Sequence, residues 1–258
     1  AIEAAEAGDK IVLVNNIALD EAGVIVDKTI TLDLNNYNIE SVGETITVIA
    51  GGDLTIIGNG NVTGNTDNYG SGSAVWAKGG KATIKGGTYS TGFDGETYLL
   101  DAHSNDTIYT SLGGEIVIED GTFVQTDYVW VLNEKANNQN TLTVKGGTFV
   151  GFNPSVANDA DEYYLAEGFV ATKDAEGNYA VVEGEWVAEV GGIKYATLAE
   201  ALAADGEVVL VADIEVAASG LTIATTEIIN LNGKTLTSTG DIFVVVAGGD
   251  LTINGQFV

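Results

Sequence analysis

Few side chains in this sequence of 258 residues have the type and spacing to carry out catalysis. The only histidine, His103, lies between Asp101 and Asp106, and an imidazole beside two carboxylates could act as a small acid–base group. However, the segment from Asp101 to Asp106 is short, small and polar, which is typical of a solvated loop. We therefore assign no catalytic residue, and we expect the chain not to be an enzyme.

Aromatic side chains form the second group with a chemical use. In Tyr128-Val129-Trp130-Val131, alternation along a strand would turn the valines inward and both rings outward. An outward row of rings suits stacking against the apolar faces of sugars. The alternative is that these rings pack against a cap or a neighbouring subunit. The candidate glycan-binding residues are Trp76, Tyr98, Tyr128 and Trp130.

Acidic side chains dominate the charge. There are 37 Asp and Glu against ten Lys and no Arg, which gives a net charge of −27. Such a charge repels phosphate, so nucleic acid is excluded as a partner. The composition is typical of a solvated outer wall that resists self-association, and attraction of cations or of a basic partner surface is the alternative.

No metal or cofactor site is indicated. The EF-hand loop and the glycine–aspartate nonapeptide of calcium-binding solenoids are both absent. A glycosidase needs two carboxylates at a defined separation, and with so many acids no such pair can be nominated. We expect neither a metal nor a cofactor.

Two residue types are missing from the sequence. There is no Cys, so disulfides play no part in stability. There is no Met, even at position 1, which favours a fragment or a processed piece of a longer polypeptide. No apolar run approaches the roughly 20 residues of a membrane span, so no membrane insertion is expected.

The elements that must position these side chains are short strands that follow paired glycines. Spacings of roughly 26 to 34 residues between them predict a solenoid in which each unit forms one coil. Coils stacked about 4.8 Å apart satisfy one another's backbone groups. The recurring phrase occupies residues 51–56, 79–89, 113–123 and 141–149.

Alternation within the strands predicts an aliphatic lumen. Ile30, Leu32 and Leu34 would face inward, whereas Thr31 and Asp33 would face solvent. The same pattern predicts inward Leu54, Ile56, Leu142 and Val144. Roughly six coils would form the first stack.

The sequence also contains a longer repeat, each copy of which spans more than one coil. Residues 11–59 align without a gap with residues 208–256, with about 19 identities in 49 positions. We therefore divide the chain into a first module, residues 1–183, and a second module, residues 184–258. The start of the first and the end of the second are expected to be truncated. Residues 151–183 would close the first stack, with a hairpin around residues 174–178.

The second copy indicates how a module begins. Two strands around Gly191-Gly192 read as a hairpin. Thr197 and Glu200 then fit a capping box. A short helix there would place Leu198 and Leu202 on one face, suited to plugging the open end of a coil stack.

Several phrases are distributed along the chain, among them DKTITLDLNNYNI, GGDLTIIGNGNV, DYVWVLNEKANN, TLTVKGGTFVGFNP and KYATLAEALAA. Together these phrases resemble a widespread family of right-handed parallel β-helices with a pectate-lyase-like architecture. Its members occur in surface proteins of anaerobic bacteria and in head-fibre or capsid-decoration proteins of their tailed phages. The resemblance covers nearly the whole chain and implies an all-β fold, a right-handed parallel β-helix of two tandem modules with a short capping helix and hairpin between them.

Some enzymes share this architecture. Pectate lyases of this shape use calcium-bound aspartates with an arginine base, and polygalacturonases use clustered aspartates with Gly-His-Gly and Arg-Ile-Lys segments. This sequence contains no arginine and no Gly-His-Gly segment. Neither pattern transfers to it.

These features lead to three functional hypotheses. The first is a non-enzymatic structural or adhesive β-helix on the virion surface of a phage, as a head fibre or capsid decoration. Its partners would be capsid or other virion proteins, copies of itself, and a glycan of the host surface. The second is an extracellular adhesin of the bacterial cell surface. The third is part of a polysaccharide-degrading depolymerase whose catalysis lies outside this sequence.

Overall fold

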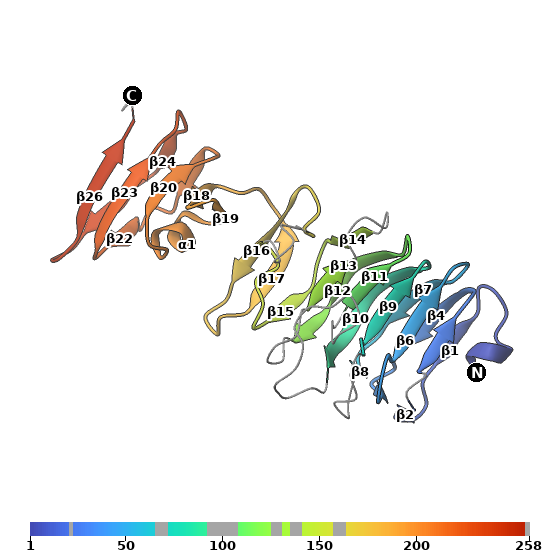
Figure 1. The fold of residues 1–258 in the computed structure, drawn as a ribbon. Helices are drawn as coiled ribbons and strands as arrows, with labels where there is room; N and C mark the ends of the chain where they lie inside the picture. Colours follow the sequence, from blue (N-terminus) through green and yellow to red (C-terminus); the bar gives the residue numbers. More distant parts are fainter. Residues whose placement is uncertain are drawn as a thin grey trace. The chain divides into compact units, whose positions relative to one another are not determined.

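The computed structural model describes residues 1–20, 23–64, 72–91, 108–124, 131–134, 141–156 and 164–255 (Figure 1). The fold is all-β, a parallel β-solenoid of about eight turns with one short α-helix, as the glycine spacing predicts. The chain divides into two units. The first comprises Ala1–Ala166 and Asp174–Val181, and the second comprises Glu167–Lys173 and Val182–Val258.

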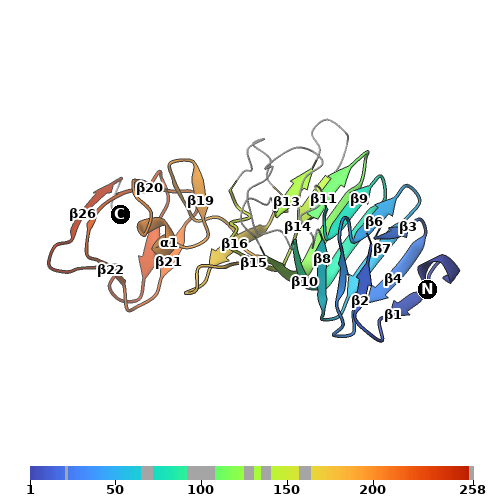
Figure 2. The same ribbon diagram turned by 60° about the horizontal axis from the view of Figure 1, so that its bottom comes forward.

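Three faces of parallel strands wall the first unit (Figures 1 and 2). The first face stacks β1 (Lys10–Val12), β4 (Thr29–Asp33), β7 (Asp53–Ile57), the start of β10 (Lys81–Thr91), the start of β12 (Glu115–Val124) and β14 (Thr141–Val144). The second face stacks β2 (Ile17–Leu19), β5 (Ile39–Ser41), β8 (Asn61–Gly64), the ends of β10 and β12, and β15 (Thr148–Val150). The third face stacks β3 (Val24–Val26), β6 (Ile46–Ile49), β9 (Val75–Lys78), β11 (Ile108–Ser111) and β13 (Leu132–Glu134). A short 3-10 helix, η1 (Ile2–Ala4), precedes the first coil.

The lumen of the first unit is aliphatic. Ile30, Leu32 and Leu34 are buried, and Thr31 and Asp33 between them are only partly covered, so the predicted alternation is confirmed. The pairing register between strands places each inward side chain of one coil beside an inward side chain of the next coil. The other inward residues predicted from alternation, Leu54, Ile56, Leu142 and Val144, are buried as well.

An aromatic stack continues this lumen along the second face. Tyr89, Phe123 and Phe149 occupy paired positions of successive coils and are fully buried. Their ring centroids lie 5.2 Å and 5.0 Å apart, with the ring planes nearly parallel. The Tyr89 hydroxyl donates to the carbonyl of Gly86 (2.8 Å), and burial raises the pKa of Tyr89. In these coils, aromatic rings take the place of aliphatic side chains in the lumen. The distance between successive rings matches the distance between successive coils.

The paired glycines perform two different tasks at the corners. Gly113 has a φ of +80°, a left-handed conformation that most residues resist. Gly114 needs no positive φ, but a Cβ on it would overlap the carbonyl oxygen of Ala77 in the preceding coil. The first glycine therefore makes the turn and the second lets two coils approach. The same division holds at Gly51-Gly52, Gly79-Gly80 and Gly248-Gly249.

An asparagine turn joins the first two faces in both units. Asn35 has a φ of +48°, and its N–H donates to the Asp33 carboxylate (3.0 Å). Its side-chain amide donates to the carbonyl of Leu13 in the preceding coil (2.9 Å). In the second unit, the amide of Asn232 donates to the carbonyl of Leu210 in the same way (3.1 Å). Each asparagine thus fixes both the turn and the stacking of two coils.

The strands expected around residues 174–178 are present as β16 (Phe169–Lys173) and β17 (Tyr179–Glu183). The turn is closed by hydrogen bonds from Asp174 N–H to the Asn178 carbonyl (2.8 Å) and from Gly177 N–H to the Asp174 carbonyl (3.2 Å). Ala180 and Tyr179 of β17 pair antiparallel with β15, which changes the strand direction at this end of the second face. The module boundary between residues 183 and 184 stays a prediction.

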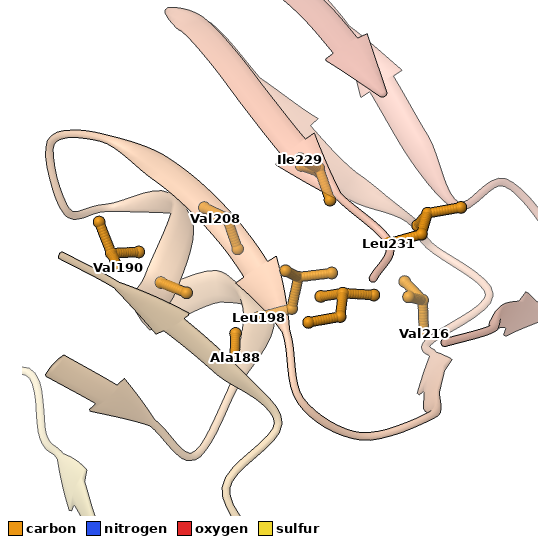
Figure 3. Close-up of a cluster of buried hydrophobic side chains, with 9 residues drawn as sticks. Ala188, Val190, Leu198, Val208, Val216, Ile229 and Leu231 are labelled. Carbon is orange, nitrogen blue, oxygen red and sulfur yellow. The ribbon is translucent and has the colours of Figure 1, made fainter. Parts of the chain in front are cut away.

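The second unit contains the predicted hairpin and helix. β18 (Ala188–Val190) and β19 (Ile193–Tyr195) pair antiparallel. In α1 (Leu198–Leu202), Thr197 Oγ1 accepts from Glu200 N–H, and the Glu200 carboxylate accepts from Thr197 N–H, so the capping box is confirmed. Leu198 enters the core, where it meets inward residues of the coils (Figure 3).

The coils of the second unit repeat the three-faced plan. One face stacks β20 (Glu207–Leu210), β23 (Thr226–Asn230) and β26 (Asp250–Asn254) in parallel. The others pair β21 (Ile214–Val216) with β24 (Leu236–Ser238) and β22 (Leu221–Ile223) with β25 (Phe243–Val245). In the part of the chain that the structure describes, no helix is long and apolar enough to cross a membrane.

Candidate functional site

Trp76 is the predicted glycan-binding residue that the structure describes. It lies in β9 on the third face, between Val75 and Ala77, which are fully buried. Alternation therefore turns Trp76 to the outer side of the wall, as expected, and its side chain is partly exposed. The other three predicted residues, Tyr98, Tyr128 and Trp130, lie outside the described residues, as do Asp101, His103 and Asp106.

The Trp76 ring is held by two contacts. Its Nε1–H donates to Ser111 Oγ on the neighbouring strand β11 (2.9 Å). The ammonium of Lys78 lies 4.5 Å from the ring centroid, within the range of a cation–π interaction. Because the ring is already fixed, a ligand that stacks on it would lose little side-chain entropy.

Two neighbours of Trp76 were missed by the sequence reasoning. Lys78 is exposed and brings a positive charge to the third face of a chain whose net charge is −27. Tyr109 of β11 is paired in register with Trp76, so the third face carries two aromatic residues at adjacent positions of successive coils. The signal was present in the sequence: Val75-Trp76-Ala77-Lys78 and Ile108-Tyr109-Thr110-Ser111 alternate in the same way.

The chemistry of this site is that of a binding platform. The indole face can stack on the apolar side of a pyranose, and the Lys78 ammonium beside it can donate a hydrogen bond to a hydroxyl or carboxylate oxygen of the sugar. The Ser111 hydroxyl is buried and accepts the indole N–H, and the set formed by Trp76, Lys78 and Ser111 contains no carboxylate or imidazole. We refer to these three residues, with the register position of Tyr109, as the third-face site.

Charged side chains on the first face pair between neighbouring coils. Lys81 Nζ lies 2.9 Å from the Glu115 carboxylate, and this hydrogen bond raises the pKa of Lys81. Lys10 Nζ lies 2.7 Å from the Asp33 carboxylate and, with the N–H of Asn35, holds the pKa of Asp33 below its ordinary value. A similar pair joins Lys85 and Glu119 at 3.0 Å. These pairs join neighbouring coils of the first unit, and the sequence as a whole holds 37 Asp and Glu against ten Lys.

The other candidate binding sites among the described residues are weaker than the third-face site. A polar hollow of about 180 Å³ runs along the glycine corner past Thr88, Thr122 and Thr148. This volume is below the roughly 300 Å³ of a typical small-molecule site. Within the described ranges, no group of three or more His, Cys, Asp or Glu side chains is placed to hold a metal ion.

Comparisons with protein-family models, with curated proteins and with solved structures gave no match.

Proposed function

We propose that this chain is a non-enzymatic display scaffold, in which stiff, acidic stacks of coils present an adhesive wall. The observation that carries the proposal is the continuity of the ladders, in which buried aliphatic and aromatic layers and inter-coil ion pairs run from one coil to the next. Such a stack resists bending because each coil hydrogen-bonds along its length to its neighbours. The net charge of −27 would keep many copies apart on a crowded surface.

We place this scaffold on the outside of a phage particle, as a head fibre or capsid decoration of the β-helix family that the sequence resembles. A phage particle, which displays many copies side by side, suits an acidic scaffold, because repulsion between copies limits clumping. The same scaffold on a bacterial surface is the second candidate, supported by the same resemblance.

Localisation separates the two candidates. Antibodies against the chain, used for immunogold labelling of purified phage particles and of the bacterial envelope, should label the outer surface of the capsid. Labelling of the envelope alone would favour the adhesin. Release of reducing sugars from host capsule by the pure chain would contradict both, since it would demand catalysis.

The adhesive part of the proposal rests on the third-face site. Trp76→Ala removes the ring on which a sugar would stack, so binding to an array of host-surface glycans should weaken about five- to tenfold, in line with the loss of one aromatic contact of about 1–1.4 kcal/mol. Trp186→Ala removes an equally large, partly buried ring from the second unit and should leave binding unchanged.

Circular dichroism of both variants serves as the control for folding. Equal glycan binding by Trp76→Ala and by the unaltered chain would rule out the third-face site. It would leave the scaffold role to be judged by the labelling experiment.

A further inference from the structure

The first face of the first unit has one uncovered edge. β1 is its outermost strand, and it is joined to β4 by hydrogen bonds such as that from Leu13 N–H to the Asp33 carbonyl (3.0 Å). Backbone groups alternate in direction along a strand, so those of Val12 and Val14 point away from β4. Among the described residues, no strand pairs with this edge, and the two valines are 44% and 71% exposed.

Beside this edge, the interior of the first coil opens into a hollow of about 720 Å³. The short helix η1 lines part of its mouth and is anchored by Lys28, whose ammonium donates to the carbonyls of Glu3 (3.4 Å) and Ala5 (3.3 Å). None of the three residues of η1 is buried. Most of the lining is apolar and includes Ile11, Leu13, Ile17, Leu19, Val24 and Val26, and the charged residues of the lining are Glu3, Asp27 and Lys28.

The second unit shows the same surface with a cover. The gapless repeat aligns Val12 with Val209 and Val14 with Val211. In the second unit, β18 pairs antiparallel with β20, with Glu189 opposite Val209, and Val211 N–H donates to the carbonyl of Val187 (3.0 Å). The edge that β1 leaves open is therefore occupied in β20.

The helix of the second unit covers the interior as well. Leu198 and Ala201 of α1 are buried against the first coil (Figure 3). Under them Val208 is fully buried, whereas Ile11, its counterpart in the first unit, is partly exposed. The β1 edge and the β20 edge therefore occupy aligned positions of the repeat, but only the β20 edge is covered by a hairpin and a helix.

We propose that the β1 edge and the hollow beside it form a docking surface for an antiparallel hairpin followed by a short capped helix, the kind of element that residues 185–202 supply to the second unit. The hairpin adds a strand to β1 through the backbone groups of Val12 and Val14. The helix places its apolar face in the hollow and removes apolar side chains from water.

Charge favours such an occupant. In the second unit, Glu189 of the hairpin lies diagonally across from Glu207, a like-charge neighbour. The residue of β1 that aligns with Glu207 is Lys10, whose ammonium pairs with Asp33 on one side and whose side chain is still about half exposed. A hairpin with an acid at this position would therefore meet an opposite charge on β1.

A grafted chain tests the proposal. Residues 185–202 replace residues 1–5 ahead of Glu6, because Ala1–Ala5 align with Leu198–Leu202. Hydrogen exchange of the Val12 and Val14 amides should slow at least tenfold relative to the unaltered chain. The thermal midpoint of the first unit should rise. The matched control carries Ala188→Asp and Leu198→Asp in the grafted copy alone, and its exchange should stay as fast as in the unaltered chain.

Three outcomes would overturn the proposal. In the first, the two amides exchange equally fast in the grafted and unaltered chains. In the second, the grafted segment shows no protection of its own, so it finds no surface to fold against. In the third, the unaltered chain protects the same amides as its concentration rises and native mass spectrometry shows a dimer, which would make a second copy the occupant.

Discussion

At the residue scale, the corner built on Asp33 couples charge to stacking. Its carboxylate accepts from Asn35 N–H and pairs with Lys10 of the preceding coil. The equivalent residue of the second unit, Asn230, accepts the same turn hydrogen bond from Asn232 N–H (3.0 Å) but is uncharged. The second unit thus shows which substitution at position 33 preserves the turn while it removes the ion pair.

Asp33→Asn should lower stability at neutral pH by about 0.2–1 kcal/mol, the usual value of a partly exposed ion pair. The pKa of Asp33 is lowered in the folded state, so its stabilising effect is complete above the unfolded value of about 3.9 and is lost as pH falls through the lower folded value. Urea unfolding of both chains at pH 7 and in the acid range measures the difference. A difference that does not shrink in acid would contradict this origin.

Glu227 breaks the inward pattern of the second unit. It aligns with the buried Ile30 and is only 8% exposed, and its carboxylate accepts from Thr225 Oγ1 (2.6 Å). Its register partner is Leu251, an apolar neighbour. A carboxylate in this position carries a desolvation cost that one hydroxyl offsets only in part.

Glu227→Ile should therefore stabilise the second unit by about 1–3 kcal/mol. Hydrogen exchange of the β23 amides is a direct measurement, since slower exchange reports the gain. Glu215→Ile changes an exposed acid of the same unit and should stay within about 0.5 kcal/mol. A loss of stability in Glu227→Ile would contradict this account, since it would show that the interactions of the Glu227 carboxylate outweigh its desolvation cost.

At the scale of elements, the glycine pairs determine how closely coils stack. Gly114→Ala would push a methyl group into the carbonyl of Ala77, and overpacking of this kind costs about 1–3 kcal/mol. Gly113→Asn introduces a residue type that also tolerates positive φ. Its loss in free energy of unfolding should be only a few tenths of the loss in Gly114→Ala. Denaturant unfolding of the two variants compares them. Equal stability of the two variants would mean that the close approach of neighbouring coils does not require a glycine at position 114.

Sequence alone predicted the elements well, because each depends on local chemistry. Period-two alternation gave the inward residues such as Ile30, and the capping box gave the start of α1. The surroundings of Trp76 could not be read in this way, because coils of unequal length hide which outward residues become neighbours. Tyr109 is paired with Trp76 although 33 positions separate them. Glu227 was missed because alternation assigns an apolar residue to its position.

At the scale of the whole first unit, one outward column crosses five successive strands of the first face, from β4 to β14. Thr31 pairs in register with Thr55, Thr55 with Thr83, Thr83 with Val117, and Val117 with Thr143. Four steps of about 4.8 Å separate the first and last members, or about 19 Å in total. Every proposal about walls, sites and caps depends on this order of coils.

The most direct measurement is a distance between spin labels on cysteines introduced at Thr31 and Thr143. The chain has no Cys of its own, so only these two positions are labelled. Pulsed electron resonance should give one narrow distribution near 19 Å, allowing for the reach of the labels. A mean separation about twice as long, or a broad distribution, would contradict the stack of parallel coils on which the account is built.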